Sequence, residues 1–193
     1  MPAQLKNVTS RNKPQYSIDK LRQRMRRLWV DHVLYTRLYM ISFLSGLPDA
    51  DFLAKRLMRN QEEIGSALGT FYGQKNGDLI TSLLKSHIDI AVELLKALKA
   101  GNKDKAAVEQ KKWDENAKSI SMILGQINPN WNTKDMYAHF SKHLALTTNE
   151  AISFVSKDYD NSIKAFDAAM DQGQQMADVL SAGVHLQFNN KFW

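Results

Sequence analysis

A period of 55 to 56 residues constrains the fold of this chain more than any other feature of its sequence. Three similar segments, at 28–33, 83–88 and 139–144, place a histidine at the same position, giving His32, His87 and His143. Further positions hold the same phase: Thr36, Ala91 and Thr147 align, and so do Asn60, Asn116 and Asp171. Since a fixed period of this kind is typical of a repeated supersecondary unit, the sequence predicts three copies of one unit.

Helical spacing of apolar residues dominates the stretches between the breaks. The four prolines lie at positions 2, 14, 48 and 129 and leave long segments uninterrupted. We therefore predict an all-α bundle of about six helices, formed from three pseudo-repeated antiparallel helical hairpins. The expected helices cover about 17–45, 51–72, 79–100, 104–127, 133–156 and 158–188, with 73–78 as a Gly/Asn-rich connection. Residues 1–16 are expected to form a flexible basic arm, and residues 17–193 a single helical-bundle domain.

Each repeated histidine is expected to lie level with a polar residue of its partner helix. In an antiparallel hairpin, residues equally far from the turn lie at the same height. At 1.5 Å per residue this level lies roughly 20 Å from each turn, so the sequence predicts a polar layer near the middle of the bundle. The candidates for this layer, or for a ligand site within it, are His32, Thr36, Asn60, His87, Asn116, His143, Thr147, Asp171 and Asp178.

Two interpretations of the layer stay open at this point. In the first, each histidine pairs with the Asn or Asp across its hairpin, which satisfies buried polar groups and sets helix register. In the second, His32, His87 and His143 bind Zn, Fe or Mn, with Asp171, Asp178 or Glu150 supplying oxygen. Neither the Glu-x-x-His pairs of helical di-iron proteins nor the HExxH pattern of zincin proteases is present, which disfavours both of those classes.

The basic residues of the chain gather at its N-terminal end. The net charge is +6, yet residues 1–27 alone carry eight basic side chains against one acidic, so the remainder sums to −1. Five of these cations fall on the start of the first expected helix, where positive charge opposes the macrodipole. Contact with nucleic acid, an anionic membrane surface or an acidic protein would offset that cost, and a solvated arm is the alternative. The candidate contact residues are Lys20, Arg22, Arg24, Arg26 and Arg27.

Several common chemistries lack the residues that they require. The chain has no cysteine, which excludes thiolate catalysis and Cys-based metal sites. Its glycines form neither a GxGxxG nor a GxxxxGK[ST] loop, and no GxSxG elbow occurs. No signal peptide and no apolar stretch of membrane-spanning length is recognisable, so we expect a cytoplasmic protein.

The chain from about residue 21 onwards resembles a family of small, uncharacterised helical bacterial proteins. The resemblance rests on the segment Leu28-Trp29-x-x-His32 with Thr36-Arg37, on Ile127-Asn128-Pro129-x-Trp131, and on residues 57–65, 113–117, 143–147 and 176–188. Some members carry the label acetylglutamate kinase. Such a kinase has an α/β fold with glycine-rich phosphate loops, and this sequence has neither, so the resemblance implies the fold and no established activity.

These observations favour a non-enzymatic helical binding or scaffold protein. Its His/Asn/Asp layer would be structural, and its basic N-terminal region would contact an anionic partner. One alternative is a metal-binding protein or mononuclear metalloenzyme that uses the three histidines. A further alternative is a small-molecule pocket at the same level, lined by Thr36, Asn60, Asn116 and Thr147.

Overall fold

The computed structural model describes residues 16–192, and within them it is all helical, as predicted. The one strand-like feature of this part of the chain is an isolated parallel bridge between Tyr16 and Phe192. The predicted arm lies outside the described residues except for Tyr16, which this bridge holds in place. The helices are α1 (Ile18–Ser45), α2 (Ala50–Tyr72), α3 (Gln74–Lys99), α4 (Lys103–Ile127), α5 (Thr133–Val155), α6 (Tyr159–Gln187) and the short 3-10 helix η1 (Asn189–Lys191).

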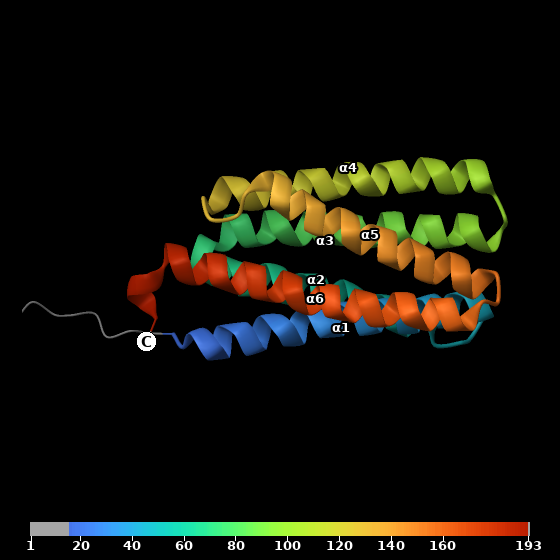
Figure 1. Ribbon diagram of the computed structural model, residues 1–193, viewed down its shortest axis with the longest axis horizontal. Coiled ribbons are helices and arrows are strands. Elements are labelled where there is room, and N and C mark those ends of the chain that lie inside the picture. The colour runs from blue at the N-terminus through green and yellow to red at the C-terminus, as the bar shows by residue number, and fades with distance from the viewer. Residues whose placement is uncertain (1–15, 193) are drawn as a thin grey trace, which may run out of the picture.

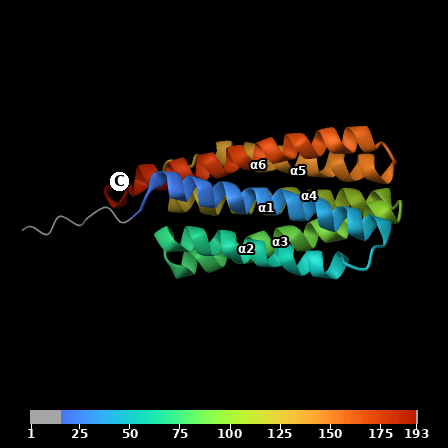
Figure 2. The same ribbon diagram turned by 90° about the horizontal axis from the view of Figure 1, so that it is seen from below.

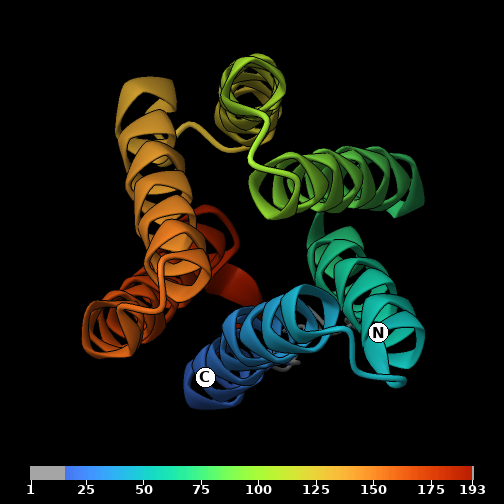
Figure 3. The same cartoon turned by 90° about the vertical axis from the view of Figure 1, so that its right-hand side faces the viewer.

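The six long helices run lengthwise beside one another (Figures 1 and 2). Viewed from the end, they follow one another around a ring in chain order (Figure 3). Helices adjacent in the sequence pack together, and α1 also packs against α6, which closes the ring. In addition, α1, α3 and α5 contact one another across the interior. The three helices that carry the repeated histidines therefore meet at the centre of the bundle.

The helix ends follow from local capping chemistry. Side-chain oxygens of Ser17, Asn102, Asn132 and Asp158 accept hydrogen bonds from backbone N–H groups of the first turns of α1, α4, α5 and α6. These contacts satisfy donors that a helix start leaves without an intrahelical partner. Gly46 takes a left-handed conformation after α1, with φ of 71°, and ends that helix.

The predicted connection over 73–78 is wrong, because α3 begins at Gln74 and Gly73 alone makes the turn. The glycines of this region serve helix packing instead. A Cβ atom on Gly77 would lie 2.9 Å from the Cα of Gly69 on α2, and one on Gly65 would lie 2.7 Å from the carbonyl oxygen of Gly77. Glycine is needed here because two helix backbones approach each other too closely for a side chain.

A continuous apolar core fills the interior toward the end of the bundle where α1 begins. Trp29, Trp113, Trp131 and Phe140 are each 2% exposed and belong to this core. Among residues 16–192, no helix is both long and apolar enough to cross a lipid bilayer.

Candidate functional site

The three repeated histidines converge in the interior. His32 on α1 and His143 on α5 face each other, with 3.3 Å between their Nε2 atoms. The ring of His87 on α3 stacks toward that of His143, with 6.3 Å between ring centroids. All three side chains are 2–3% exposed. The three histidines therefore lie together in one buried layer.

Carboxamides on the outer helices hold two of these imidazoles. Asn116 Oδ1 lies 2.9 Å from His87 Nδ1, and Gln61 Nε2 lies 3.2 Å from His32 Nδ1. Each carboxamide residue follows its histidine by 29 positions. The same spacing from His143 leads to Gln172, which is fully buried.

A second contact recurs in all three hairpins. The amide nitrogens of Asn60, Asn116 and Gln172 donate to the backbone carbonyls of Leu28, Leu83 and His139, at 3.0 Å in each case. Each of these carbonyls lies four residues before a repeated histidine. The prediction of Asp171 as the third polar partner is wrong by one residue, because Asp171 is exposed while Gln172 faces the interior.

The contact with Asn116 determines which nitrogen of His87 carries its hydrogen. Asn116 donates its N–H to Leu83, so its oxygen faces His87, and His87 Nδ1 must carry the hydrogen. Nε2 of His87 is then an acceptor. The two amide hydrogens of Gln61 face three acceptors, namely His32 Nδ1, the carbonyl oxygen of Leu57 and Oδ1 of Asn60. His32 and His143 are joined directly through their Nε2 atoms, and one of these two atoms carries the shared hydrogen. His87 is held separately by Asn116.

Burial keeps these imidazoles uncharged. Burial, together with the neighbouring histidines, lowers the pKa of His32 well below its ordinary value. The same causes lower the pKa of His87 to about 3. Burial lowers the pKa of His143 to about 4, against the raising influence of Gln172. An uncharged imidazole avoids the desolvation penalty that a buried cation would pay.

The layer borders a small internal cavity. Its volume is about 30 Å³, and the residues that line it include the three histidines, Thr36, Thr147 and Thr148. At roughly 10–15 Å³ for one water, the cavity has room for about two water molecules. Thr36 Oγ1 donates to the carbonyl of His32, and Thr147 is 8% exposed. Both predicted threonines therefore adjoin the histidines, but the space beside them is too small for an organic ligand.

The donor set does not suit a divalent metal ion. Within residues 16–192, no group of three or more His, Asp or Glu side chains is arranged to hold a metal. The acidic candidates are engaged elsewhere: Asp178 forms a two-point ion pair with Arg26, and Glu150 pairs with Arg37 at 2.6 Å. A dication between neutral imidazoles would have no neighbouring carboxylate to balance its charge, which is costly in a buried site.

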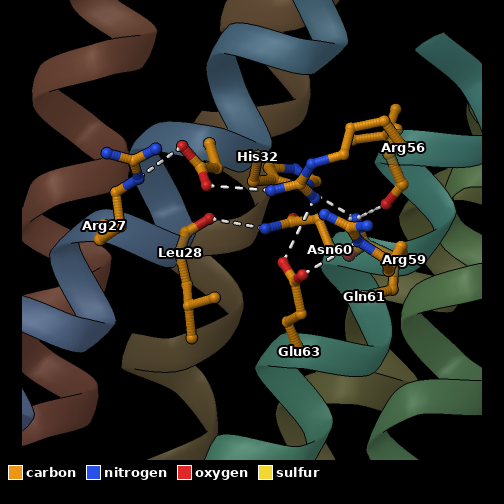
Figure 4. A network of polar contacts seen from close by, with 10 residues as sticks. Arg27, Leu28, His32, Arg56, Arg59, Asn60, Gln61 and Glu63 are labelled. Atoms are coloured by element: carbon orange, nitrogen blue, oxygen red, sulfur yellow. Dashed lines mark hydrogen bonds and ion pairs between the residues drawn. The ribbon is translucent and has the colours of Figure 1, made fainter.

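A second polar network, which the sequence interpretation missed, links α1 to α2 beside the layer (Figure 4). Asp31 is 7% exposed and accepts from Arg27 at 2.9 Å and from Arg56 at 3.1 Å. Arg56 also forms an ion pair with Glu63, and Glu63 forms a second ion pair with Arg59. The sequence did offer a signal for this network, because Asp31 is an acidic residue directly before His32 in a mostly apolar segment.

The five predicted contact residues at the start of α1 are all exposed. Three of them have acidic partners, namely Arg22 with Asp19, Arg26 with Asp178 and Arg27 with Asp31. Lys20 and Arg24 form no ion pair with any residue of the described range 16–192. Of the five contact candidates, these two are therefore the ones without an acidic partner among residues 16–192.

Comparison of this chain with protein-family models, with curated proteins and with solved structures finds no match. The resemblance to uncharacterised helical bacterial proteins therefore stays a prediction, and the site itself is the basis for a functional proposal.

Proposed function

We propose that this protein is a non-enzymatic helical binding module that holds an anionic partner on the basic first turns of α1. The observation that carries the proposal is the state of Lys20 and Arg24. Both are exposed, and neither has an acidic partner within residues 16–192, whereas the cations around them are paired.

The internal charge balance of α1 supports this proposal. Lys20 and Arg24 are four residues apart on one helix, where like charges repel by a few tenths of a kcal/mol. They also lie near the helix N-terminus, whose partial positive charge disfavours cations. An anionic partner removes both costs, so the arrangement is better suited to a complex than to the free protein.

The polar layer supports a structural role for the interior. Its histidines are neutral and hydrogen-bonded to one another or to carboxamides, and among residues 16–192 no carboxylate forms a hydrogen bond with them. Buried polar networks of this kind set the register of packed helices. We therefore assign ligand binding to the surface of α1 and helix alignment to the histidines.

Retention on an immobilised sulfated polysaccharide tests the proposal. The variant Lys20→Gln/Arg24→Gln is expected to elute at clearly lower salt than the unmodified protein. A matched control is Lys103→Gln/Lys111→Gln, which removes two exposed lysines of α4 that form no ion pair within the described chain. Both variants carry the same net charge, so equal elution of the two would refute a specific role for α1.

A further inference from the structure

A surface pocket lies where the start of α1 meets the end of α2. Its volume is about 190 Å³, and Lys20 and Arg24 line it together with Ser17 and Thr70. Leu21 and the aromatic rings of Tyr16 and Phe71 complete the lining. The two unpaired cations thus share one concave site.

The aromatic side of this pocket is held in place by the C-terminal segment. Tyr16 and Phe71 have ring centroids 5.0 Å apart, and Phe192 stacks on Phe71 with centroids 5.8 Å apart. The backbone N–H of Tyr16 donates to the carbonyl of Lys191 at 2.9 Å. Three segments that are distant in sequence therefore build the wall, and a ligand would meet a preformed apolar surface.

The polar side of the pocket offers hydrogen-bond donors. Arg24 presents a guanidinium and Lys20 an ammonium group, neither of which can accept. Ser17 Oγ accepts from the backbone N–H of Lys20, which leaves the hydroxyl hydrogen free to donate. Thr70 donates its hydroxyl hydrogen to the carbonyl of Ser66 and contributes no donor.

We propose that this pocket binds a phosphate monoester whose organic part is aromatic or apolar. This inference rests on the proposed function and names the ligand class for the same site. A phosphate monoester carries a charge of about −1.5 to −2 at pH 7, which two cations match, whereas a carboxylate requires one. The pocket is smaller than the roughly 300–1,000 Å³ of sites for drug-sized ligands, so it suits one such group with a small substituent.

Titration of the ¹⁵N-labelled full chain with phenyl phosphate tests the proposal, with benzoate as the singly charged comparison. Phenyl phosphate is expected to shift the amide signals of residues 16–24 and 70–71 saturably, and benzoate is expected to bind more weakly. Lys20→Gln/Arg24→Gln should weaken phenyl phosphate binding by about tenfold or more, as expected for two lost charged contacts. The control Lys103→Gln/Lys111→Gln should leave it unchanged.

Equal affinities of the two double variants, or shifts confined to other residues, would overturn the proposal. Retention on the polysaccharide without phenyl phosphate binding would overturn the pocket and leave the proposed function standing, while loss of both would overturn both. Binding to vesicles of phosphatidylcholine with and without phosphatidate tells whether the bound phosphate group belongs to a lipid headgroup or to a soluble monoester. Binding that requires phosphatidate and is lost in Lys20→Gln/Arg24→Gln assigns a lipid headgroup, and phenyl phosphate binding without vesicle binding assigns a soluble monoester.

Discussion

Mild acid is expected to destabilise this protein through its histidine layer. The folded-state pKa values of His32, His87 and His143 are all lowered by burial, those of the last two to about 3 and about 4. A histidine whose pKa is lowered in the folded state contributes stability that is fully present above its ordinary pKa of 6.5. This stability is lost as the pH falls below 6.5, because the unfolded state then binds a proton that the folded state does not. Between pH 5 and 6, unfolding therefore takes up nearly three protons at these residues.

Glu150 reduces the number of protons taken up on unfolding by about one. Burial raises its pKa to about 7, against the lowering influence of Arg37, so the folded state binds a proton there that the unfolded state releases. Its contribution to stability is present at low pH and is lost as the pH rises through about 7. The net uptake on unfolding is about two protons, and at 1.36 kcal/mol per proton and pH unit the free energy of unfolding should fall by about 3 kcal/mol per unit.

Urea denaturation followed by circular dichroism at several pH values between 5 and 6 measures this slope. Glu150→Gln should steepen it by one proton, and His143→Gln should reduce it by one. His139→Gln is the matched control on α5, because His139 is half-buried and outside the layer. A slope near zero, or one that His139→Gln changes as much as His143→Gln does, would refute a buried neutral layer.

Three further results are expected. Asn116→Leu leaves His87 Nδ1 without its partner, removes the second hydrogen bond to the carbonyl of Leu83 and should cost about 2–4 kcal/mol in urea denaturation, against less than about 0.5 for the exposed neighbour Glu115→Ala. Gly77→Ala forces apart two helix backbones at Gly69 and should cost about 1–3 kcal/mol; an unchanged denaturation midpoint would contradict the close approach. Elemental analysis of chelator-free protein should find substoichiometric Zn, Fe and Mn, and one equivalent that the triple histidine-to-alanine variant loses would reverse the structural assignment of the layer.

The sequence predicted the helices and the level of the histidines because both depend on spacing along the chain. The conversion of spacing into height placed His32 and His143 in one layer, where their Nε2 atoms are 3.3 Å apart. Helix starts at capping residues such as Ser17 were likewise predictable, since capping is a local interaction.

The errors arise where tertiary packing decides between neighbouring residues. Asp171 and Gln172 are adjacent, and only the rotation of α6 determines which one faces the interior. A constant spacing of 29 residues from each histidine would have selected Gln61, Asn116 and Gln172, whereas the assumed spacing varied by one. Gly77 was placed in the loop that Gly73 alone forms, because composition does not distinguish a turn from a close helix contact.

The Asp31 network and the pocket beside Lys20 could not be predicted from the sequence pattern. Asp31 meets Arg56 across the α1–α2 contact, a pairing that no periodicity encodes. The pocket depends on Phe192 stacking against Phe71, which brings the end of the described chain to its beginning. Both contacts join different helices or chain segments, so neither can be read from the pattern of any one helix.

The salt dependence of polysaccharide binding tests the central claim most directly. The logarithm of the association constant should fall linearly with the logarithm of the salt concentration, because each protein cation that contacts the polymer releases counterions. For Lys20→Gln/Arg24→Gln we predict a slope smaller in magnitude by about two, with Lys103→Gln/Lys111→Gln matching the unmodified protein. Equal slopes for the three proteins, or binding that salt does not weaken, would contradict an anionic partner on the first turns of α1.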